Sequence, residues 1–435
     1  MNYKKVEKRL ALSNKTLTTS TLILTVIGFS NGVLANGLTV NEQSASGAGT
    51  AYAGRSSSAL DASTIYGNPA GLTKLKRSEV SGGVAVFDVK NDISDAQGGA
   101  PGTNKGNFVP MAPVPFGYLS TPISEDLSVG LGLYVPFGLV NDSESTFQGR
   151  YQGSYSDVKV VTLQPTIAYR INQHVSIGGG PTINRFDAEL QNDLATGAFN
   201  AGKDTTIKID GTDTALGYNL GLLVDLNPAT SWGITYHSKV NYHLKGHTTV
   251  SDSPGFLGLN GKYDAKLDIT LPESVDTSIT HHFNERWTGY LGATWTRWSR
   301  IQQIETETNV SGAGNAGSLE SLSEPLNWRD TWSAAVGGSY QLTPQWVLRA
   351  GYAYDPSPSH NADRSVRLPV GNRKSVTLGA GYSPNPNVTI DVAYGYVWES
   401  TASVTKANAS GVQPEYSAKF DNSANGLVTQ MTYRF

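Results

Sequence analysis

The last eleven residues of the chain, 425–435, read NGLVTQMTYRF. Because side chains alternate between the two faces of a strand, this stretch has one apolar face and one polar face. The apolar face carries Leu427, Met431, Tyr433 and Phe435, and the polar face carries Gln430, Thr432 and Arg434. The pattern predicts a strand that separates an apolar environment from a polar one and closes a β-barrel. An exposed edge strand of a soluble sheet is the alternative.

The composition limits the other possibilities. Only 16% of the 435 residues are charged, and glycine is abundant at 47 residues. The chain has no cysteine, which excludes disulfides, cysteine-ligated zinc and thiol catalysis. After the N-terminal region no apolar run is long enough for a transmembrane helix, and the mean hydropathy of −0.28 suits a barrel with one polar face. The mildly acidic formal charge of −3 gives no support for nucleic-acid binding.

The first 35 residues have the three parts of a secretory signal peptide. Basic residues are concentrated at the start, and an apolar core, TLILTVIGF, occupies residues 21–29. Val33 and Ala35 then supply apolar or small side chains ahead of a cleavage point. We therefore expect residues 1–35 to be removed, so that Asn36 becomes the N-terminus of the mature chain. A short buried helix is the alternative.

Residues 36–78 do not have the pattern of barrel strands. They are rich in Gly, Ala and Ser and show no sustained alternation. A flexible linker is one interpretation of that composition. The motif Asn68-Pro69-Ala70 favours a compact plug instead, because Pro69 restricts its own backbone and restrains Asn68 to an extended or turn conformation. We expect this segment to lie inside a barrel formed by residues 79–435.

Short and long connections alternate along residues 79–435. Six short polar breaks are predicted to be turns because they are rich in Asn, Pro and Thr: 122–126, 172–174, 227–230, 284–286, 343–345 and 385–387. Seven longer polar segments separate them: 91–110, 137–157, 191–212, 251–264, 303–327, 357–372 and 403–424. The alternation predicts an all-β fold, a transmembrane antiparallel β-barrel of fourteen strands with both ends on the side of the short turns.

Aromatic residues lie beside the short turns in strand after strand. Those that follow a turn are Trp232, Trp287 and Trp346, and those that precede one are Tyr118, Tyr169, Phe283, Tyr340 and Tyr382. Amphipathic rings at such places predict an aromatic girdle at one membrane–water interface. A second girdle is predicted near the long segments, at Trp298, Trp328 and Trp398. A soluble all-β protein needs no aromatic residues at these places.

The segment predicted to be a plug resembles a known family. Residues 47–54 (GAGTAYAG), Ala59, residues 61–64 and residues 68–72 (NPAGL) are similar to the N-terminal hatch of the FadL family. These proteins are outer-membrane transporters for long-chain fatty acids and other hydrophobic compounds. The segments 135–139 (VPFGL), 149–151, 328–332, 348–351 and 354–358 also resemble the family. The resemblance therefore covers nearly all of the mature chain.

The resemblance implies a mechanism as well as a fold. It implies passive transport of a hydrophobic molecule, with long-chain fatty acids first among the substrates. In the family a kink in the third strand opens the barrel wall, which here places a lateral opening at Pro136, Phe137 and Gly138. It also implies a ligand site beside the mature N-terminus, at Asn36, Gly37 and Leu38.

Two basic residues, Arg185 and Arg329, are candidate anchors for a substrate carboxylate. Arg185 shares its parity with Asp187 and Glu189, so we expect these three side chains to face the lumen. The positions that resemble the basic lumen residues of the family fall near Asp187 and Glu324. This departure keeps uncharged aliphatic or aromatic hydrocarbons as alternative substrates, and structural ion pairs as an alternative role for both arginines.

No catalytic site, metal site or cofactor is predicted, and we expect a protein that is not an enzyme. His281 and His282 are adjacent and point to opposite faces of a strand, so they do not form a metal site. The expected partners are a hydrophobic ligand, the outer-membrane lipids of a Gram-negative bacterium, and the assembly machinery that reads the terminal strand ending at Phe435. A monomer is expected. A porin for polar solutes or a structural surface protein is the alternative from another class.

Overall fold

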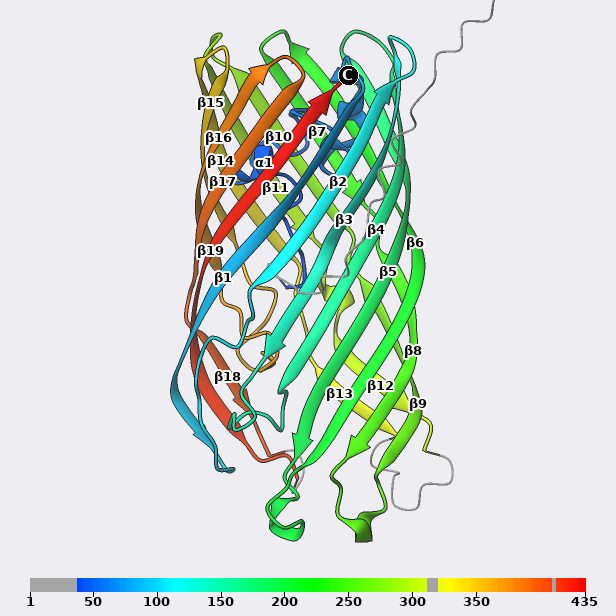
Figure 1. Cartoon of the computed structure of the whole chain (residues 1–435), viewed down its shortest axis with the longest axis vertical. Helices are drawn as coiled ribbons and strands as arrows, with labels where there is room; N and C mark the ends of the chain where they lie inside the picture. The colour runs from blue at the N-terminus through cyan, green and yellow to red at the C-terminus, as the bar shows by residue number, and fades with distance from the viewer. Residues whose placement is uncertain (1–36, 311–319, 409–411) are drawn as a thin grey trace, which may run out of the picture.

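The computed structural model describes residues 37–310, 320–408 and 412–435. These residues form a closed antiparallel β-barrel with a short-helical segment inside it (Figure 1). In this part of the chain, nineteen strand segments make fourteen crossings of the barrel, because five crossings are interrupted once. No helix among these residues is long and apolar enough to cross a membrane.

Nine crossings of the described chain are single strands: β1 (Glu79–Gly98), β2 (Ala112–Pro122), β3 (Leu127–Asp142), β4 (Tyr155–Arg170), β5 (Val175–Leu194), β6 (Thr205–Asn227), β15 (Trp346–Asp355), β16 (Arg373–Asn385) and β19 (Tyr416–Arg434). The interrupted crossings are β7 (Thr230–His237) with β8 (Val240–Ser251), β9 (Gly261–Leu271) with β10 (Ser274–His282), β11 (Trp287–Thr296) with β12 (Gln303–Thr308), β13 (Ser321–Pro325) with β14 (Thr331–Thr343), and β17 (Val388–Glu399) with β18 (Ala402–Lys406).

The last strand closes the barrel, as the alternation of residues 425–435 predicts. β19 pairs with β1 in antiparallel register from Glu79↔Arg434 onwards, and it pairs with β17 on its other side. The backbone N–H of Phe435 donates to the carbonyl of Ser78 at 2.9 Å, and the Arg434 side chain bonds Glu79 at 3.0 Å. Pairing of the first strand with the last removes the two edges that an open sheet would expose to lipid.

The six predicted short turns all connect strands at one end of the barrel, which is the end that holds the C-terminus (Figure 1). The long connections are at the other end, but they are shorter than predicted, since the strands extend into the polar segments. β1 extends to Gly98 and β6 begins at Thr205, for example, although 91–110 and 191–212 were expected to be loops. Polar sequence does not end a strand whose backbone groups still have partners in the neighbouring strand.

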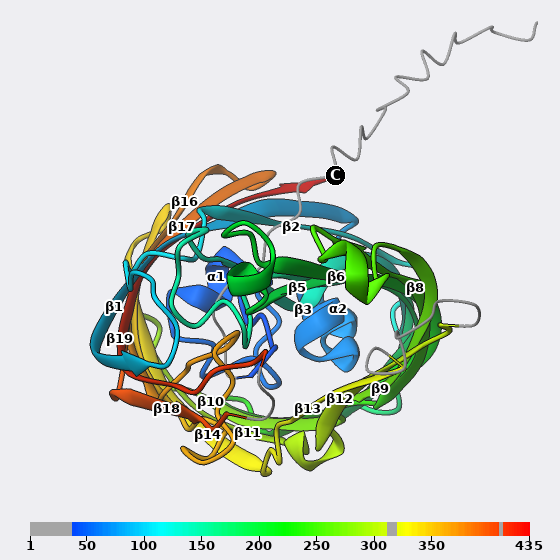
Figure 2. The same ribbon diagram turned by 90° about the horizontal axis from the view of Figure 1, so that it is seen from below.

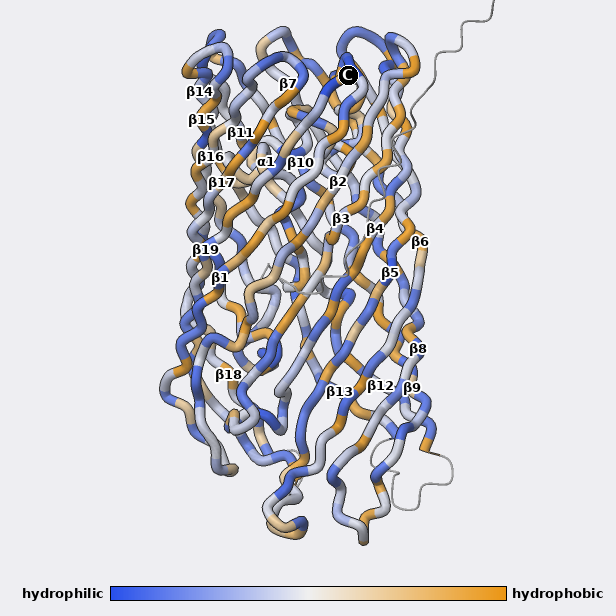
Figure 3. Tube along the Cα trace, viewed as in Figure 1, coloured by the Kyte–Doolittle hydropathy of each residue, from blue (hydrophilic) through white to orange (hydrophobic). Residues whose placement is uncertain are grey.

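The outer wall is apolar where the barrel crosses the membrane. Exposed fractions of 40–60% are found for Leu119, Leu131, Ile167, Val336 and Leu378, and Leu216 reaches 72%. Figure 3 shows hydrophobic residues recurring along the strands toward the short turns, whereas the end with the long connections is mostly hydrophilic. An outward apolar band on a barrel of this kind faces lipid.

Only some of the predicted girdle residues face outward. Near the short turns, Trp287 packs on Tyr340 and Trp346 on Tyr382, with ring centroids 4.7 and 4.5 Å apart. Tyr118 does not belong to this girdle: it is 3% exposed and donates to the carbonyl of Gln43. The prediction for Trp298 and Trp328 was also wrong, because both are buried in the lumen.

Residues 37–78 lie inside the barrel (Figure 2). They contain α1 (Ala45–Ala48), α2 (Thr64–Gly67) and the 3₁₀ helix η1 (Pro69–Lys74). Three further 3₁₀ turns, η2 (Gly197–Phe199), η3 (Gly255–Leu257) and η4 (Trp298–Arg300), interrupt the barrel chain. We call residues 37–78 the lumen segment.

The arrangement predicts the exposure of each connection. A peptide tag inserted at 197–202 or 255–258 should be labelled by antibody on intact cells, because these turns cap strands at the end with the long connections. The same tag at 227–230 or 343–346 should become accessible only after the outer membrane is permeabilised. Labelling of both pairs on intact cells contradicts the assigned orientation.

Candidate functional site

The lumen segment is attached to the barrel through the motif that the sequence singled out. The Asn68 side chain accepts from the backbone N–H of Ala70 at 3.0 Å, which begins η1. Its Nδ2 donates to the carbonyl of Ser56 at 2.6 Å and to the carbonyl of Leu222 in β6 at 3.0 Å. One buried amide therefore organises a turn, joins two parts of the lumen segment and connects both to the wall.

Glycines on several strands of the barrel receive the backbone of the lumen segment. A Cβ atom at Gly233 would lie 1.8 Å from the carbonyl oxygen of Ser56, and one at Gly351 would lie 2.2 Å from the carbonyl carbon of Thr50. The other glycines of this kind are Gly178, Gly292, Gly337 and Gly379, where a Cβ would meet the backbone of residues 49–70 at 2.4–2.7 Å. A Cβ at Gly221 would instead meet the side-chain oxygen of Asn68 at 2.0 Å. The lack of side chains there allows backbone to pack on backbone, so we call them the glycine belt.

The start of the lumen segment pairs with the third strand. The N–H of Val40 donates to the carbonyl of Pro136 at 2.8 Å, and the N–H of Gly138 donates to the carbonyl of Leu38 at 2.8 Å. Thr39 and Phe137 form the antiparallel bridge between these bonds. Residues 38–40 therefore act as a very short extra strand beside β3.

This extra strand lies where the barrel wall loses its regular pairing. β2 pairs with β3 only from Pro122↔Ser128 to Gly117↔Leu133, although β2 continues to pair with β1 as far as Ala112. Beyond Tyr134, β3 has a bulge in its pairing with β4, which resumes at Phe137. The seam between β2 and β3 is therefore unpaired from residue 116 toward the long connections.

Two prolines explain why β2 does not pair there. Pro113 and Pro115 have no N–H, and both lie in the part of β2 that faces the seam. The β1 ladder is continuous through both prolines, opposite Val86 and Val84, so the missing donors are on the edge facing β3. Because the two prolines are two residues apart, both missing N–H donors lie on the same edge of the strand.

β3 also bends into the lumen after the bulge. Along its first half, buried and more exposed residues alternate, but Gly138, Leu139, Val140 and Asn141 are all buried in succession. A strand in the barrel wall has one lipid-facing or solvent-facing side, so burial of consecutive residues means that both sides are covered. Both sides of the end of β3 are therefore covered by protein, with Leu139 in the cluster of Trp298 and Val140 in the cluster of Phe108.

An aromatic cluster lies beside this bend. Trp298 of η4 is fully buried, and its ring is 5.2 Å from Trp328 and 6.4 Å from Phe137, edge to face in both pairs. Gly37, with a φ of +59°, lies against the indole, since a Cβ there would be 2.8 Å from it. Leu38 belongs to the same buried cluster. The start of the lumen segment thus packs on the aromatic cluster and pairs with the bent strand.

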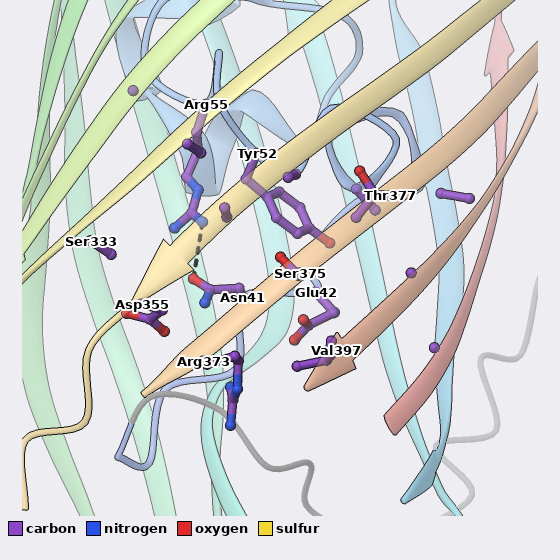
Figure 4. Close-up of a pocket in the computed structure, with 18 of the residues that line it drawn as sticks. Asn41, Glu42, Tyr52, Arg55, Ser333, Asp355, Arg373, Ser375, Thr377 and Val397 are labelled. Atoms are coloured by element: carbon purple, nitrogen blue, oxygen red, sulfur yellow. Dashed lines mark hydrogen bonds between the residues drawn. The ribbon is translucent and has the colours of Figure 1, made fainter. Parts of the chain in front are cut away.

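Two cavities with mixed apolar and polar linings continue from this point into the lumen. The larger, of about 1020 Å³, lies between the lumen segment and the inner faces of β10, β11 and β14–β17. Figure 4 shows Asn41, Glu42 and Arg55 facing Arg373 and other strand residues, and Arg55 donates to Asn41 at 2.9 Å. The second, of about 790 Å³, is lined by Pro136, Phe137 and His237 and shares Asn41 and Arg55 with the first. The cavities therefore connect the lumen with the bend of β3.

The charges of the larger cavity are mutually compensated. Arg55 is half-buried and lies near the carboxylates of Glu42 and Asp276. Arg373 bonds Glu399 at 2.8 Å. Burial raises the pKa of the Glu42 carboxyl above its ordinary value, against the opposing effect of Arg373. The cavity thus combines small apolar side chains with a balanced set of charged and polar groups.

Comparison with known proteins shows the family to which the chain belongs. The sequence profile of a family described as outer membrane protein transport protein (OMPP1/FadL/TodX) matches residues 26–435. The chain belongs to this family. It is therefore a transport protein of the outer membrane of a Gram-negative bacterium and not an enzyme.

Individual relatives resemble the chain along its whole length. A long-chain fatty acid transport protein of Escherichia coli O6:H1 (strain CFT073) is 27% identical, with 98% of this chain and 100% of the relative covered. The crystal structure of a Pseudomonas aeruginosa FadL homologue superposes with a TM-score of 0.81 at 26% identity, covering 92% of this chain and 99% of that one. The Ralstonia pickettii toluene transporter TbuX has the same fold, with a TM-score of 0.64 at 19% identity, covering 87% of this chain and 95% of that one.

Of the ligand residues predicted near the N-terminus, those that the structure describes lie beside the bulge of β3. Gly37 and Leu38 are buried beside the bend of β3, and Asn36 lies outside the described residues. Pro136, Phe137 and Gly138 are at the bulge and its pairing with residues 38–40. The structure therefore places Gly37 and Leu38 beside Pro136, Phe137 and Gly138, and their roles in ligand binding and in a lateral opening stay predictions.

The two predicted carboxylate anchors are placed differently. Arg185 faces outward, where it bonds Asp187 at 3.2 Å and approaches Thr214, whereas its neighbours Asn184 and Phe186 face the lumen. The expectation that Arg185, Asp187 and Glu189 face inward was wrong, since the parity of a strand gives two sets of residues but not which set faces in. Arg329 is exposed, in the segment between β13 and β14, and does not line either cavity.

Other residues of the site were missed. Pro113 and Pro115 lie in a strand that the sequence predicted, and their spacing of two signals an edge without donors. Arg55 and Glu42 are in the segment whose composition resembles a linker, and nothing in their neighbourhood marks them as lumen charges. Trp298 was assigned to a girdle because it lies near a long polar segment of the sequence. That position does not reveal the 3₁₀ turn η4, which directs the side chain into the lumen.

The glycine belt predicts the effect of a single methyl group. Gly233→Ala should displace the lumen segment, because its Cβ meets backbone at Ser56 and overpacking of this kind costs about 1–3 kcal/mol. We expect an increased leak of small polar solutes in liposome-swelling measurements. Gly395→Ala is the control, since its Cβ meets only the Thr377 side chain at 3.5 Å. Equal permeability of the two variants contradicts the role of the belt.

Proposed function

We propose that the protein passes long-chain fatty acids, or molecules of similar hydrophobicity, across the outer membrane through a lateral opening between β2 and β3. The observation that carries the proposal is the unpaired seam beside Pro113 and Pro115, with residues 38–40 paired to the bent part of β3 on its lumen side. The long-chain fatty acid transport protein of Escherichia coli, similar along the whole chain, supports this substrate class.

The route is short and remains away from bulk water. A ligand in the second cavity lies next to Pro136 and Phe137, which border the seam. Leaving through a straight aqueous pore would expose its hydrocarbon to water, at about 0.8 kcal/mol for each CH₂ group. A lateral exit into lipid avoids this cost. No energy source is part of the proposal, so net flow follows the concentration gradient.

Residues 38–40 are the moving part of this mechanism. Their two backbone hydrogen bonds satisfy groups of β3 that lack a partner in β2. Displacement of this short segment exposes the seam and joins it to the cavity. Residues 41–78, which the glycine belt and Asn68 attach to the wall, remain in place and exclude an open aqueous channel.

The proposal includes the organisation of the chain. Residues 1–35 are a signal peptide, residues 36–78 a plug and residues 79–435 the barrel. The protein is a monomer in contact with outer-membrane lipids, and the terminal strand ending at Phe435 is read by the assembly machinery. The closure of the barrel by β19 supports this last role, because the strand is the last to be synthesised and pairs on both sides.

A second substrate class, uncharged aliphatic or aromatic hydrocarbons, is favoured by one observation. The predicted anchor Arg185 faces outward and Arg329 lines neither cavity, while Arg55 and Arg373 lie near carboxylates. A hydrocarbon needs no cationic partner in the lumen. Uptake of oleate and of toluene by the same cells distinguishes the two classes directly.

The lateral exit is tested by repairing the strand. Pro136→Val with Gly138→Thr supplies a backbone donor and two β-branched side chains, which favour a regular strand. We expect normal assembly, retained binding of oleate, and oleate uptake reduced by about tenfold or more, equivalent to about 1.4 kcal/mol in the rate-limiting barrier.

The control for this variant is Pro344→Val, which replaces a proline in the short turn between β14 and β15, at the opposite end of the barrel from the long connections. The route through the seam is excluded if the double variant binds and takes up oleate at the wild-type rate while β3 in its structure pairs with β4 without the bulge between Tyr134 and Phe137.

A further inference from the structure

One of the long connections is folded into the barrel. The segment between β15 and β16 was expected to be an outer loop, and its ends are where the sequence placed them. Within it, however, residues 357–359 and 364–371 are buried, and only residues near its tip are exposed. The buried run reads RSVRLPVG, with three large apolar side chains. We call residues 357–371 the strap.

The side chain of Arg367 attaches the strap to the opposite wall. Its guanidinium donates to the carbonyls of Tyr155 in β4 and Gln191 in β5 at 2.8 and 2.9 Å. It also donates to the Ser156 hydroxyl at 3.3 Å and lies 3.5 Å from the Glu324 carboxylate in β13. Arg367 is 8% exposed. A buried guanidinium with this many acceptors is held in one position by several strands at once.

Further bonds continue across the lumen. The Asn422 side chain of β19 donates to the carbonyl of Pro369 at 2.8 Å, and the Asn141 side chain of β3 donates to the carbonyl of Arg367 at 3.3 Å. Arg364 donates to the carbonyl of Ser403 in β18 at 3.1 Å. The strap is therefore bonded to strands on different sides of the barrel and crosses the lumen on the side of the long connections.

Two of the three apolar side chains of the strap lie in the cluster beside the proposed exit, whereas Val366 belongs to a separate cluster. Leu368 and Val370 are 3% and 1% exposed and belong to the same buried cluster as Leu38, Trp298 and Trp328. The strap and the short segment that pairs with β3 thus share one apolar cluster, with the strap nearer to the cell exterior. In this arrangement protein side chains occupy the apolar centre of the lumen.

We propose that the strap is the outer lid of the transport route, with Arg367 as the positioning residue that keeps it closed. An apolar ligand opens it by replacing Leu368 and Val370 in the cluster, so that the cluster remains covered while the strap moves outward. A polar solute offers no such replacement, and displacing the strap for it would leave apolar surface in water. The inference rests on the proposed transport function, and it adds the step that admits the ligand.

An engineered disulfide can fix the strap to the barrel reversibly. The chain has no cysteine, so introduced cysteines have no native competitor. A Cβ built at Gly153 lies 2.6 Å from Cγ of Arg367, which places the two β-carbons within the range that a disulfide spans. Gly153→Cys with Arg367→Cys therefore replaces the ionic attachment by a covalent one. Arg367→Cys alone gives a strap without its attachment, and Gly153→Cys alone controls for the second site.

Oleate uptake is measured for each variant, oxidised and reduced. The oxidised double variant should take up oleate at least tenfold more slowly than its reduced form, and a thiol reductant should restore the rate. Neither single variant should respond to oxidation, and Arg367→Lys should be closer to wild type than Arg367→Cys in its leak of small polar solutes. This reversible loss separates a moving lid from a merely structural segment.

Equal uptake by the oxidised and reduced double variant, with the disulfide demonstrated by mass spectrometry, overturns the lid. Absence of uptake of both oleate and toluene by the wild-type protein overturns the proposed function instead. The two failures are therefore distinguishable. Assembly is checked in every variant by the resistance of the barrel to SDS at room temperature, so that a folding defect is not taken for a closed lid.

Discussion

The structure depends on one constraint, which is that each backbone N–H and C=O inside a membrane needs a partner within the protein. Pairing of β19 with β1 satisfies this requirement by removing both sheet edges. The seam between β2 and β3 is the exception, and the sequence creates it with Pro113, Pro115 and Pro136, which have no donor to contribute. Residues 38–40 then supply the partners that the third strand lacks. At this place the wall is held by the hydrogen bonds of a short segment and not by those of a full strand, which is the basis of the proposed lateral opening.

The inside of the barrel is filled by two different kinds of contact. On the side of the short turns, strand glycines accept the backbone of the lumen segment, and Asn68 connects it to β6. Backbone packing of this kind leaves little freedom, since any displacement encounters the wall. On the side of the long connections, large apolar side chains from separate segments meet in one cluster around Trp298. Such a cluster is exchangeable, because a hydrophobic ligand can make the same non-directional contacts as the side chains that it replaces.

Polar groups separate these two regions. Arg55, Glu42 and Asp276 lie together between the lumen segment and the strands, and Arg349 bonds Asp391 at 2.7 Å nearby in β15 and β17. Buried charges require compensation, and removing one partner leaves the other uncompensated. The charged layer therefore restrains the lumen segment through electrostatics, while the apolar cluster above it is the part of the lumen suited to a hydrophobic ligand.

The sequence by itself determined the barrel, its strand number and its direction, because a period of two, polar turns and a terminal aromatic residue are local properties. The motif at Asn68, together with the resemblance to the FadL family, also located the lumen segment and the bend at Pro136. Only the tertiary structure decided which face of β5 is the lumen face, so that Arg185 points outward, and which connections fold inward. The tertiary structure also places Trp298 in a buried cluster, although the sequence predicted a girdle residue. The first physical reason is that alternation divides a strand into two faces but does not determine which of them faces the lumen. The second is that the burial of a loop depends on partners that are far away in the chain, here Tyr155, Gln191 and Asn422.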